Sequence, residues 1–375
     1  MFLQSLHLKQ FRNYSDQAVK FLAPKTILLG ENAQGKSNLL EAVELLATLK
    51  SHRTSRDRDL IQNDTNSAQI QASLKRELGI SSLQLTLRRG SRRTAVINGE
   101  TLRRQQDFLG NLNAVQFSCL DLELVRGGPV TRRTWTDSLL TQLEPVYHHI
   151  LQQYSQVLKQ RNAFIKQQTA DPGQTPPLDP TQLALWDAQL ATLGTRVIRR
   201  RARMLQRLIP IAQSWHQAIS GSTEQLEIFY SPNVDVDTDD AGQIQQAFLE
   251  KLQSRAMAEY YQRTTLVGPH RDDINFLIND TPARQYGSQG QQRTLVLALK
   301  LSELQLIEEI VGEPPLLLLD DVLAELDLNR QNQLLETIED RFQTLITTTH
   351  LGSFDTQWLK LSQIMQVKNG CLEIS

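Results

Sequence analysis

Eight residues near the amino terminus have the types and the spacing of a loop that binds phosphate. The pattern GxxxxGK(S/T) is met by Gly30, Glu31, Asn32, Ala33, Gln34, Gly35, Lys36 and Ser37. In such a loop, backbone N–H groups and the start of the following helix face the phosphates of a bound nucleotide. We therefore expect Lys36 to reach the β- and γ-phosphates of ATP and Ser37 to offer a hydroxyl to Mg²⁺, which prefers oxygen ligands.

A second candidate group lies far along the chain, where an apolar run of strand length, residues 316–319, ends in two carboxylates. This arrangement is typical of a strand that carries a magnesium ligand and a hydrolytic base. We expect Asp320 to bind Mg²⁺ and Asp321 to polarise the attacking water. The alternative is an ordinary buried strand that leaves the core through a polar turn.

A third candidate group precedes a predicted helix over residues 295–307 and consists of Ser288, Gln289, Gly290 and Gln291. These four residues resemble the LSGGQ signature of ABC ATPases, with Gln in place of the first of its two glycines. A serine hydroxyl and free backbone amides at a helix start form a second phosphate-binding surface. The resemblance implies that the signature of one copy completes the ATP site of another, which predicts an ATP-dependent homodimer. The alternative is a polar, glycine-containing loop before a helix.

Two further residues are candidates for the ATP site because of their positions. His350 ends a predicted strand, residues 345–349, where ABC ATPases place a histidine that senses the γ-phosphate; a lone histidine is otherwise more often structural. Gln116 is a candidate for the glutamine that joins Mg²⁺ to a helical lobe in these proteins. Residues 324–327 resemble the loop that follows the acidic strand.

Periodicity places these residues on the elements of a mixed fold. Residues 25–29 predict a strand, the residues after Ser37 predict a helix, and the segments around Asn98-Gly99 predict a hairpin. Helical stripes then follow at 143–158, 181–208 and 244–261, with a proline-rich link at 171–180.

The two magnesium-binding candidates are separated by far more chain than a compact nucleotide-binding fold needs, so the core must be split by an insertion. We therefore predict an α/β fold: an ABC-type P-loop ATPase head, with a mixed sheet and flanking helices, interrupted by a mainly helical lobe. The expected division is 1–130 for the first part of the head, 131–262 for the lobe and 263–375 for the second part.

Several motifs together resemble the RecF family, which belongs with the SMC and Rad50 ATPase heads. They are residues 8–14, the phosphate loop, and residues 51–53, 268–273 and 288–294. The resemblance covers nearly the whole chain. It implies weak, DNA-stimulated hydrolysis of ATP with Mg²⁺, dimerisation on ATP, and binding to duplex, junction or gapped DNA. It also implies cooperation with RecR and RecO to load RecA in replication, recombinational repair and the SOS response.

Two basic clusters are candidates for contact with DNA phosphates. The first lies on one predicted helix of the lobe and comprises Arg196, Arg199, Arg200, Arg201, Arg203 and Arg207. The second follows the phosphate-loop helix and comprises His52, Arg53, Arg56 and Arg58, and its alternative is contact with the nucleotide. For the lobe helix, the alternative is a solvated basic face or pairing with acidic residues elsewhere in the chain.

Composition limits the partners only weakly. The 40 Lys and Arg residues balance 41 Asp and Glu residues, so any DNA site must be a local patch. No apolar run approaches the roughly 20 residues of a membrane span, and we expect a cytoplasmic protein without a membrane partner. Cys119 and Cys371 suggest neither a disulfide framework nor a zinc site, and we expect buried or incidental thiols.

Two alternative functions share the nucleotide motifs. The motor subunit of an ABC transporter normally has a short inserted lobe and docks on a membrane partner, whereas the middle of this chain is long and rich in arginine. The other alternative is an ATP-gated structural clamp of the SMC/Rad50 kind, in which hydrolysis only resets binding.

Overall fold

The computed structural model describes residues 1–77, 79–168, 180–235, 237–323, 328–338, 341–352, 354 and 356–374. The chain forms two compact units. The first contains Met1–Leu122, Ile211–Glu224 and Gln289–Ser375, and the second contains Glu123–Pro210 and Gln225–Ser288. Each unit is described by itself.

Two six-stranded sheets form the first unit. One is antiparallel, in the order β2 (Tyr14–Lys20), β1 (Phe2–Phe11), β4 (Ser67–Arg76), β5 (Gly79–Arg88), β6 (Thr94–Ile97) and β7 (Glu100–Thr101). The other is parallel except for its first strand, in the order β15 (Cys371–Ile374), β14 (Ser362–Lys368), β3 (Lys25–Leu29), β13 (Thr344–Thr348), β12 (Leu316–Asp320) and β8 (Ala114–Ser118).

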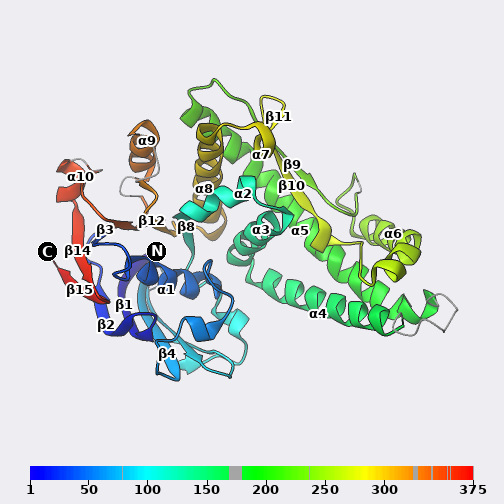
Figure 1. Cartoon of the computed structure of the whole chain (residues 1–375), viewed down its shortest axis with the longest axis horizontal. Helices are drawn as coiled ribbons and strands as arrows, with labels where there is room; N and C mark the ends of the chain where they lie inside the picture. Colours follow the sequence, from blue (N-terminus) through cyan, green and yellow to red (C-terminus); the bar gives the residue numbers. More distant parts are fainter. Residues whose placement is uncertain are drawn as a thin grey trace. The chain divides into compact units, whose positions relative to one another are not determined.

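The second sheet unites distant parts of the chain, as the blue β3, orange β12 and red β14 of Figure 1 show. Helix α1 (Lys36–Thr48) contacts β5 of the antiparallel sheet and β8, β12 and β13 of the parallel one. Its apolar residues are therefore buried nearly all round, and they share one core with both sheets. This packing fixes the start of α1 against the carboxyl ends of the parallel strands.

The other helices of the first unit are α8 (Gln289–Val311), α9 (Leu328–Ile338) and α10 (Thr356–Lys360), with short 3₁₀ turns η1 (Asp57–Asp59), η2 (Gln105–Phe108) and η3 (Cys119–Leu122). The predicted turn at Asn98-Gly99 is confirmed. It joins β6 to β7, and both residues have positive φ, 51° and 84°. Cys119 and Cys371 are both exposed, so of the two alternatives, buried or incidental thiols, the buried one is wrong.

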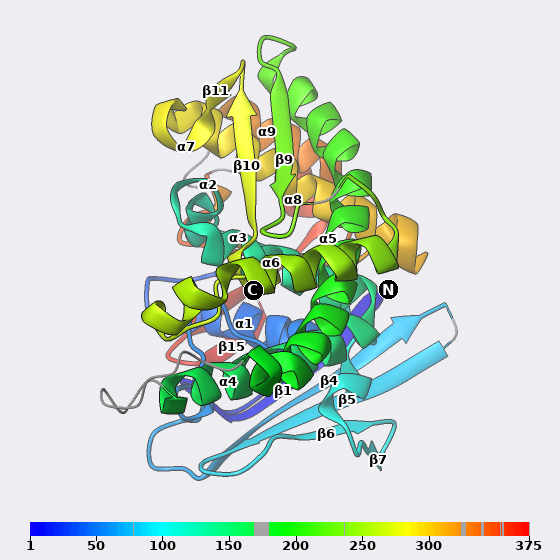
Figure 2. The same ribbon diagram turned by 90° about the vertical axis from the view of Figure 1, so that its right-hand side faces the viewer.

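Helices dominate the second unit. They are α2 (Glu123–Arg126), α3 (Pro129–Leu143), α4 (Pro145–Gln168), α5 (Pro180–Ser220) as far as Pro210, α6 (Ala241–Gln262), the 3₁₀ turn η4 (Pro269–Arg271) and α7 (Ala283–Tyr286). A small antiparallel sheet accompanies them, in the order β11 (Thr281–Pro282), β10 (Asp273–Ile278) and β9 (Leu226–Ser231). Figure 2 shows β9 and β10 side by side.

The predicted helical stripes correspond to α4, α5 and α6, whereas α3 was not predicted. The unit boundaries also differ from the division expected at 130, 262 and 263, because residues 263–288 lie in the second unit. Residues 273–278 of this segment form β10, which pairs with β9 rather than with the sheets of the first unit. Residues 171–179 of the proline-rich link lie outside the described residues.

Buried ion pairs fasten the second unit together. Arg201, with its side chain only 4% exposed, bonds the carboxylates of Asp137 and Asp272 at 2.9 to 3.0 Å. Arg161 bonds Asp187 at 2.6 Å and Glu259 at 2.7 Å. Each guanidinium therefore has carboxylate partners, as a buried charge requires. Within the described part of the chain, no helix is both long enough and apolar enough to cross a membrane.

Candidate ATP site

The phosphate loop connects β3 to α1 and needs glycine at two positions. A Cβ at residue 30 would lie 2.4 Å from the carbonyl oxygen of Val367, which is far inside contact distance. At Gly35 a Cβ would lie 2.6 Å from the Asn13 amide nitrogen, and the residue has φ +117°. Only glycine tolerates both the close approach and the left-handed backbone. The geometry thus explains the two glycines of the motif.

Asn13 and Tyr14 fix the direction of the peptide groups in the loop. The Asn13 side-chain amide donates to the carbonyl oxygen of Gln34 at 2.9 Å, and the Tyr14 hydroxyl donates to that of Gly35 at 2.9 Å. The N–H of a trans peptide points opposite to its C=O. The N–H groups of Gly35 and Lys36 therefore point away from these two side chains, as phosphate binding at a helix start requires.

Lys36 is nearly buried, at 4% exposure, and its ammonium group lies inside the loop. It donates to the carbonyl oxygens of Gly30 and Glu31 at 2.8 and 2.9 Å. These are contacts that phosphate oxygens can replace without moving the helix. The position suits a lysine that neutralises the charge of a bound triphosphate.

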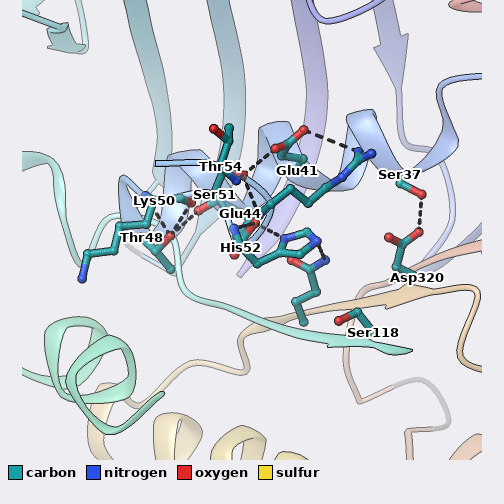
Figure 3. Close-up of polar contacts among 12 residues, drawn as sticks. Ser37, Glu41, Glu44, Thr48, Lys50, Ser51, His52, Thr54, Ser118 and Asp320 are labelled. Carbon is teal, nitrogen blue, oxygen red and sulfur yellow. Dashed lines mark hydrogen bonds and ion pairs between the residues drawn. The ribbon is translucent and has the colours of Figure 1, made fainter. Parts of the chain in front are cut away.

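The two residues predicted to bind magnesium lie side by side (Figure 3). The Ser37 hydroxyl donates to Asp320 Oδ1 at 2.7 Å, although 283 positions separate them in the sequence. Thr347 Oγ1, on the neighbouring strand β13, donates to the same carboxylate oxygen at 2.8 Å. Three oxygen-bearing side chains therefore meet beside the phosphate loop. This donor set fits Mg²⁺, which takes oxygen ligands and shares them with phosphates and water.

Asp321 follows β12 in a left-handed conformation, with φ 53°. Its backbone N–H donates to Thr347 Oγ1 at 2.9 Å, which holds the turn in place. Burial raises the pKa of the Asp321 carboxyl; Lys36 opposes the rise and the neighbouring Asp320 adds to it. A raised pKa suits a carboxylate that takes a proton from water.

Gln116 lies on β8, and His350 lies two residues beyond the end of β13. Gln116 pairs with Leu318 of β12, and Ser118, two residues further along β8, pairs with Asp320. Its Oε1 atom is buried and has no hydrogen-bond partner among the described residues. His350 follows β13, whose Thr348 carbonyl oxygen accepts from the N–H of Gly30 at 3.2 Å. The His350 side chain is exposed and lies 3.0 Å from the Thr349 hydroxyl.

The signature residues lie at the start of α8. Ser288 and Gln289 are exposed, and Gly290 and Gln291 are half-buried in the first turn of the helix. Arg330 donates to the Gly290 carbonyl oxygen at 3.3 Å. An exposed helix start of this kind is accessible to the nucleotide of a second copy. Residues 324–327, which resemble the loop after the acidic strand, lie outside the described residues.

Most arginines of the lobe cluster are paired within the second unit. Arg199 and Arg203 both bond Asp239, at 3.1 and 2.5 Å, and Arg200 bonds Glu144 at 3.0 Å. Arg201 is buried. Arg196 and Arg207 are exposed. The geometry thus favours the alternative of pairing with acidic residues for the centre of this cluster.

The second basic cluster is larger than the sequence analysis indicated. Arg56 and Arg58 line an open cleft of about 760 Å³ together with Arg88 and Arg92, which lie at the turn between β5 and β6. Arg53 donates to the side chain of Asn38 on α1 at 2.8 Å. The cleft therefore gathers guanidinium groups from two segments of the first unit, and Asp57 also lines it.

Sequence reasoning missed Arg88, Arg92 and Thr347. The two arginines belong to the run Arg-Arg-Gly-Ser-Arg-Arg at 88–93, which a search for charge at turns detects. Thr347 carries no such signal, because its role depends on which strand lies beside β12. The sequence places His52 in a basic group and in the motif at 51–53, whereas its contacts with Glu44 of α1 and Gln116 of β8 depend on the fold.

Comparison with known families places the chain among DNA repair ATPases. The model of the RecF/RecN/SMC N-terminal domain matches residues 2–373. The DNA replication and repair protein RecF of Nostoc punctiforme is 68% identical over 374 residues, which cover 99% of this chain and 98% of that protein. The protein with the same name from Acaryochloris marina is 65% identical over the full length of both chains, 100% of each.

Solved structures give the same picture. The recombination mediator protein RecF-ATPrS of the RecFOR pathway has a TM-score of 0.91 and 31% identity, with 100% of this chain and 98% of that chain covered. A Smc head from Pyrococcus furiosus, bound to the C-terminal domain of ScpA, has a TM-score of 0.55 and 14% identity, with 100% and 96% covered. The latter similarity concerns the fold alone.

Proposed function

Because the chain belongs to the RecF family, within the wider RecF/RecN/SMC group, we propose that it is an ATP-dependent DNA-binding protein of replication and recombinational repair. The observation that carries this proposal is the hydrogen bond between Ser37 and Asp320, which joins the phosphate loop to the acidic strand end. Two motifs from opposite ends of the chain thus form one oxygen-lined site beside a phosphate loop.

Each residue of the site has a distinct role in this proposal. The N–H groups at the start of α1 and the Lys36 ammonium hold the phosphates. Ser37 and Asp320 hold Mg²⁺, which neutralises charge on the phosphate oxygens during phosphoryl transfer. Asp321 accepts a proton from the attacking water, and Gln116 and His350 contact the γ-phosphate side of the nucleotide.

The exposed signature supports dimerisation on ATP. Ser288, Gln289, Gly290 and Gln291 of one copy face the nucleotide held by the loop of the other, so that two equivalent sites form about a twofold axis. The dimer is slow to hydrolyse ATP and is stimulated by DNA. It acts in the cytoplasm at duplex, junction or gapped DNA, where RecR and RecO join it to help load RecA.

We assign the DNA backbone to the cleft formed by Arg56, Arg58, Arg88 and Arg92, with Arg53 beside it. The lobe helix is a weaker candidate, because Arg199, Arg200 and Arg203 are neutralised by their own carboxylate partners. Contact with phosphates alone makes binding sensitive to salt and nearly independent of sequence.

Turnover of ATP and binding of a gapped duplex, measured over a salt series, test this proposal. We expect DNA to stimulate hydrolysis by the unaltered protein. The double variant Arg88→Ala, Arg92→Ala should lose this stimulation and lower the salt slope of binding by about two. The matched control Arg199→Ala, Arg203→Ala should bind almost as the unaltered protein does.

If the control variant loses more DNA binding than the cleft variant does, the DNA contact lies on the lobe helix instead.

Hydrolysis that responds to membrane vesicles and not to DNA would contradict the repair function and favour a transporter motor. The Lys36→Ala variant should neither bind nor hydrolyse ATP, which checks that the measured turnover belongs to this site.

A further inference from the structure

Two polar side chains, Glu44 and His52, link the phosphate-loop helix to Gln116. Glu44 lies on α1 and His52 lies in the segment after α1, and Figure 3 shows these two side chains close together. Gln116 lies on β8. His52 Nδ1 is 2.7 Å from Glu44 Oε2, and His52 Nε2 is 3.4 Å from Gln116 Nε2. The imidazole therefore lies between a carboxylate and an amide.

Several hydrogen bonds hold the His52 segment against α1. The Ser51 hydroxyl donates to Glu41 Oε1 at 2.5 Å, and Glu41 is fully buried. The backbone N–H of His52 donates to Glu44 Oε2 at 3.3 Å, and that of Arg53 donates to Ser51 Oγ at 3.0 Å. The ring is thus fixed from its backbone as well as through Nδ1.

The carboxylate decides which hydrogen-bonding role the ring offers to Gln116. A carboxylate only accepts, so Nδ1 must carry a hydrogen. Burial lowers the pKa of His52, but the contact with Glu44 outweighs burial and raises that pKa above its ordinary value; while the ring is neutral, Nε2 is an acceptor. The Gln116 NH₂ group must face such an acceptor, and its carbonyl oxygen must face the other way. The structure has this arrangement: Gln116 Oε1 is buried and has no partner among the described residues.

The freed carbonyl oxygen belongs to a strand at the ATP site, because β8 pairs with β12 in parallel and brings Gln116 two residues before the Asp320 level. We propose that His52, held by Glu44, is a positioning residue that fixes the orientation of the Gln116 amide and so turns its carbonyl oxygen toward the nucleotide. This inference rests on the proposed ATPase function.

A double-mutant cycle on the full-length protein tests the proposal. We expect His52→Leu and Gln116→Leu each to lower kcat for ATP about tenfold with little change in KM, since supporting residues of this kind typically cost 10- to 100-fold. The double variant should be no slower than Gln116→Leu alone, because both changes act through one amide. His52→Gln, which keeps a hydrogen-bonding side chain, should recover part of the rate.

The matched control is Lys50→Gln, an exposed residue of the same segment whose hydrogen bonds with Thr48 use its backbone carbonyl and N–H groups. It should hydrolyse ATP as the unaltered protein does. A double variant in which the two losses multiply, or a His52→Leu effect on KM alone, would overturn the positioning role while leaving the ATPase function intact. An unaltered protein that binds no ATP and hydrolyses none would contradict both.

Discussion

The two adjacent carboxylates at the end of β12 have different surroundings and therefore different chemistry. Asp320 accepts hydrogen bonds from Ser37 and Thr347, which hold it in the geometry of a metal ligand. Asp321 is turned by its positive φ, makes its hydrogen bond to Thr347 through the backbone, and has a raised pKa because of burial. We propose that the Asp321 side chain, which Thr347 also contacts, takes the proton of the attacking water.

Replacing Asp321 with Asn tests this division of roles. The backbone bond to Thr347 does not involve the side chain, so the fold of the turn should survive. We expect ATP binding within about twofold of the unaltered protein and single-turnover hydrolysis slower by at least about 100-fold, the usual contribution of a general base. If Asp321→Asn hydrolyses ATP at a near-normal rate, the general base is another residue.

At the scale of elements, the signature helix and the Gln116 strand are connected. Lys300, on α8, is buried and bonds Asp121 and Glu303, each at 3.2 Å. Asp121 in turn accepts from the N–H of Ser118, the last residue of β8, at 2.6 Å. These bonds tie the helix that begins with the signature to the strand that carries Gln116, so a change at either end has a defined route to the other.

A half-buried histidine, His270, makes the stability of the second unit depend on pH. Burial, assisted by nearby arginines, lowers the pKa of His270 to about 4 despite its contact with the Thr265 carbonyl oxygen. The neutral ring also lies 2.6 Å from the Tyr154 hydroxyl. An unfolded histidine has a pKa of about 6.5, so the unfolded chain takes up a proton first as the pH falls.

We therefore expect the free energy of unfolding to decrease between about pH 6.5 and 4, by roughly 3 kcal/mol from this group, and to be insensitive to it above that range. Urea unfolding at several pH values, compared with His270→Asn, measures the contribution. The variant should lose less stability over the same interval. Equal slopes for the two proteins would show that His270 is not kept neutral by the fold.

Local signals predicted much of the ATP site, and long-range pairing decided what they missed. Gly30, Lys36 and Ser37 lie in a motif, and the strand before it and the helix after it can both be predicted from the residues next to it in the sequence. The assignment of β10 depends on its pairing with β9, and alternation along one strand does not say which sheet the strand joins. Likewise, Asp239, which is distant in the sequence, pairs with Arg199 and Arg203 of the lobe helix. The sequence therefore could not tell which of the two basic clusters has unpaired charge for DNA.

At the scale of the whole molecule, the resemblance to the RecF family, expected from five motifs, is confirmed by relatives that match nearly the entire chain. The structure divides into a unit with the nucleotide motifs and a mainly helical unit, as the large separation of Ser37 and Asp320 required. An ATP-gated clamp and a DNA-stimulated ATPase share this architecture. They differ in whether DNA loading needs turnover or only the ATP-bound dimer.

The proposed mechanism depends most on ATP being held between two copies of the chain. Sedimentation velocity measures the resulting dimer directly. We expect a monomer without nucleotide, a dimer with ATP and Mg²⁺, and a monomer under both conditions for Ser288→Arg, because a bulky cation at the exposed start of α8 blocks the second half of the site. The variant should still bind ATP through its own phosphate loop. A dimer that forms equally well without ATP, or one that Ser288→Arg leaves unchanged, would contradict the mechanism.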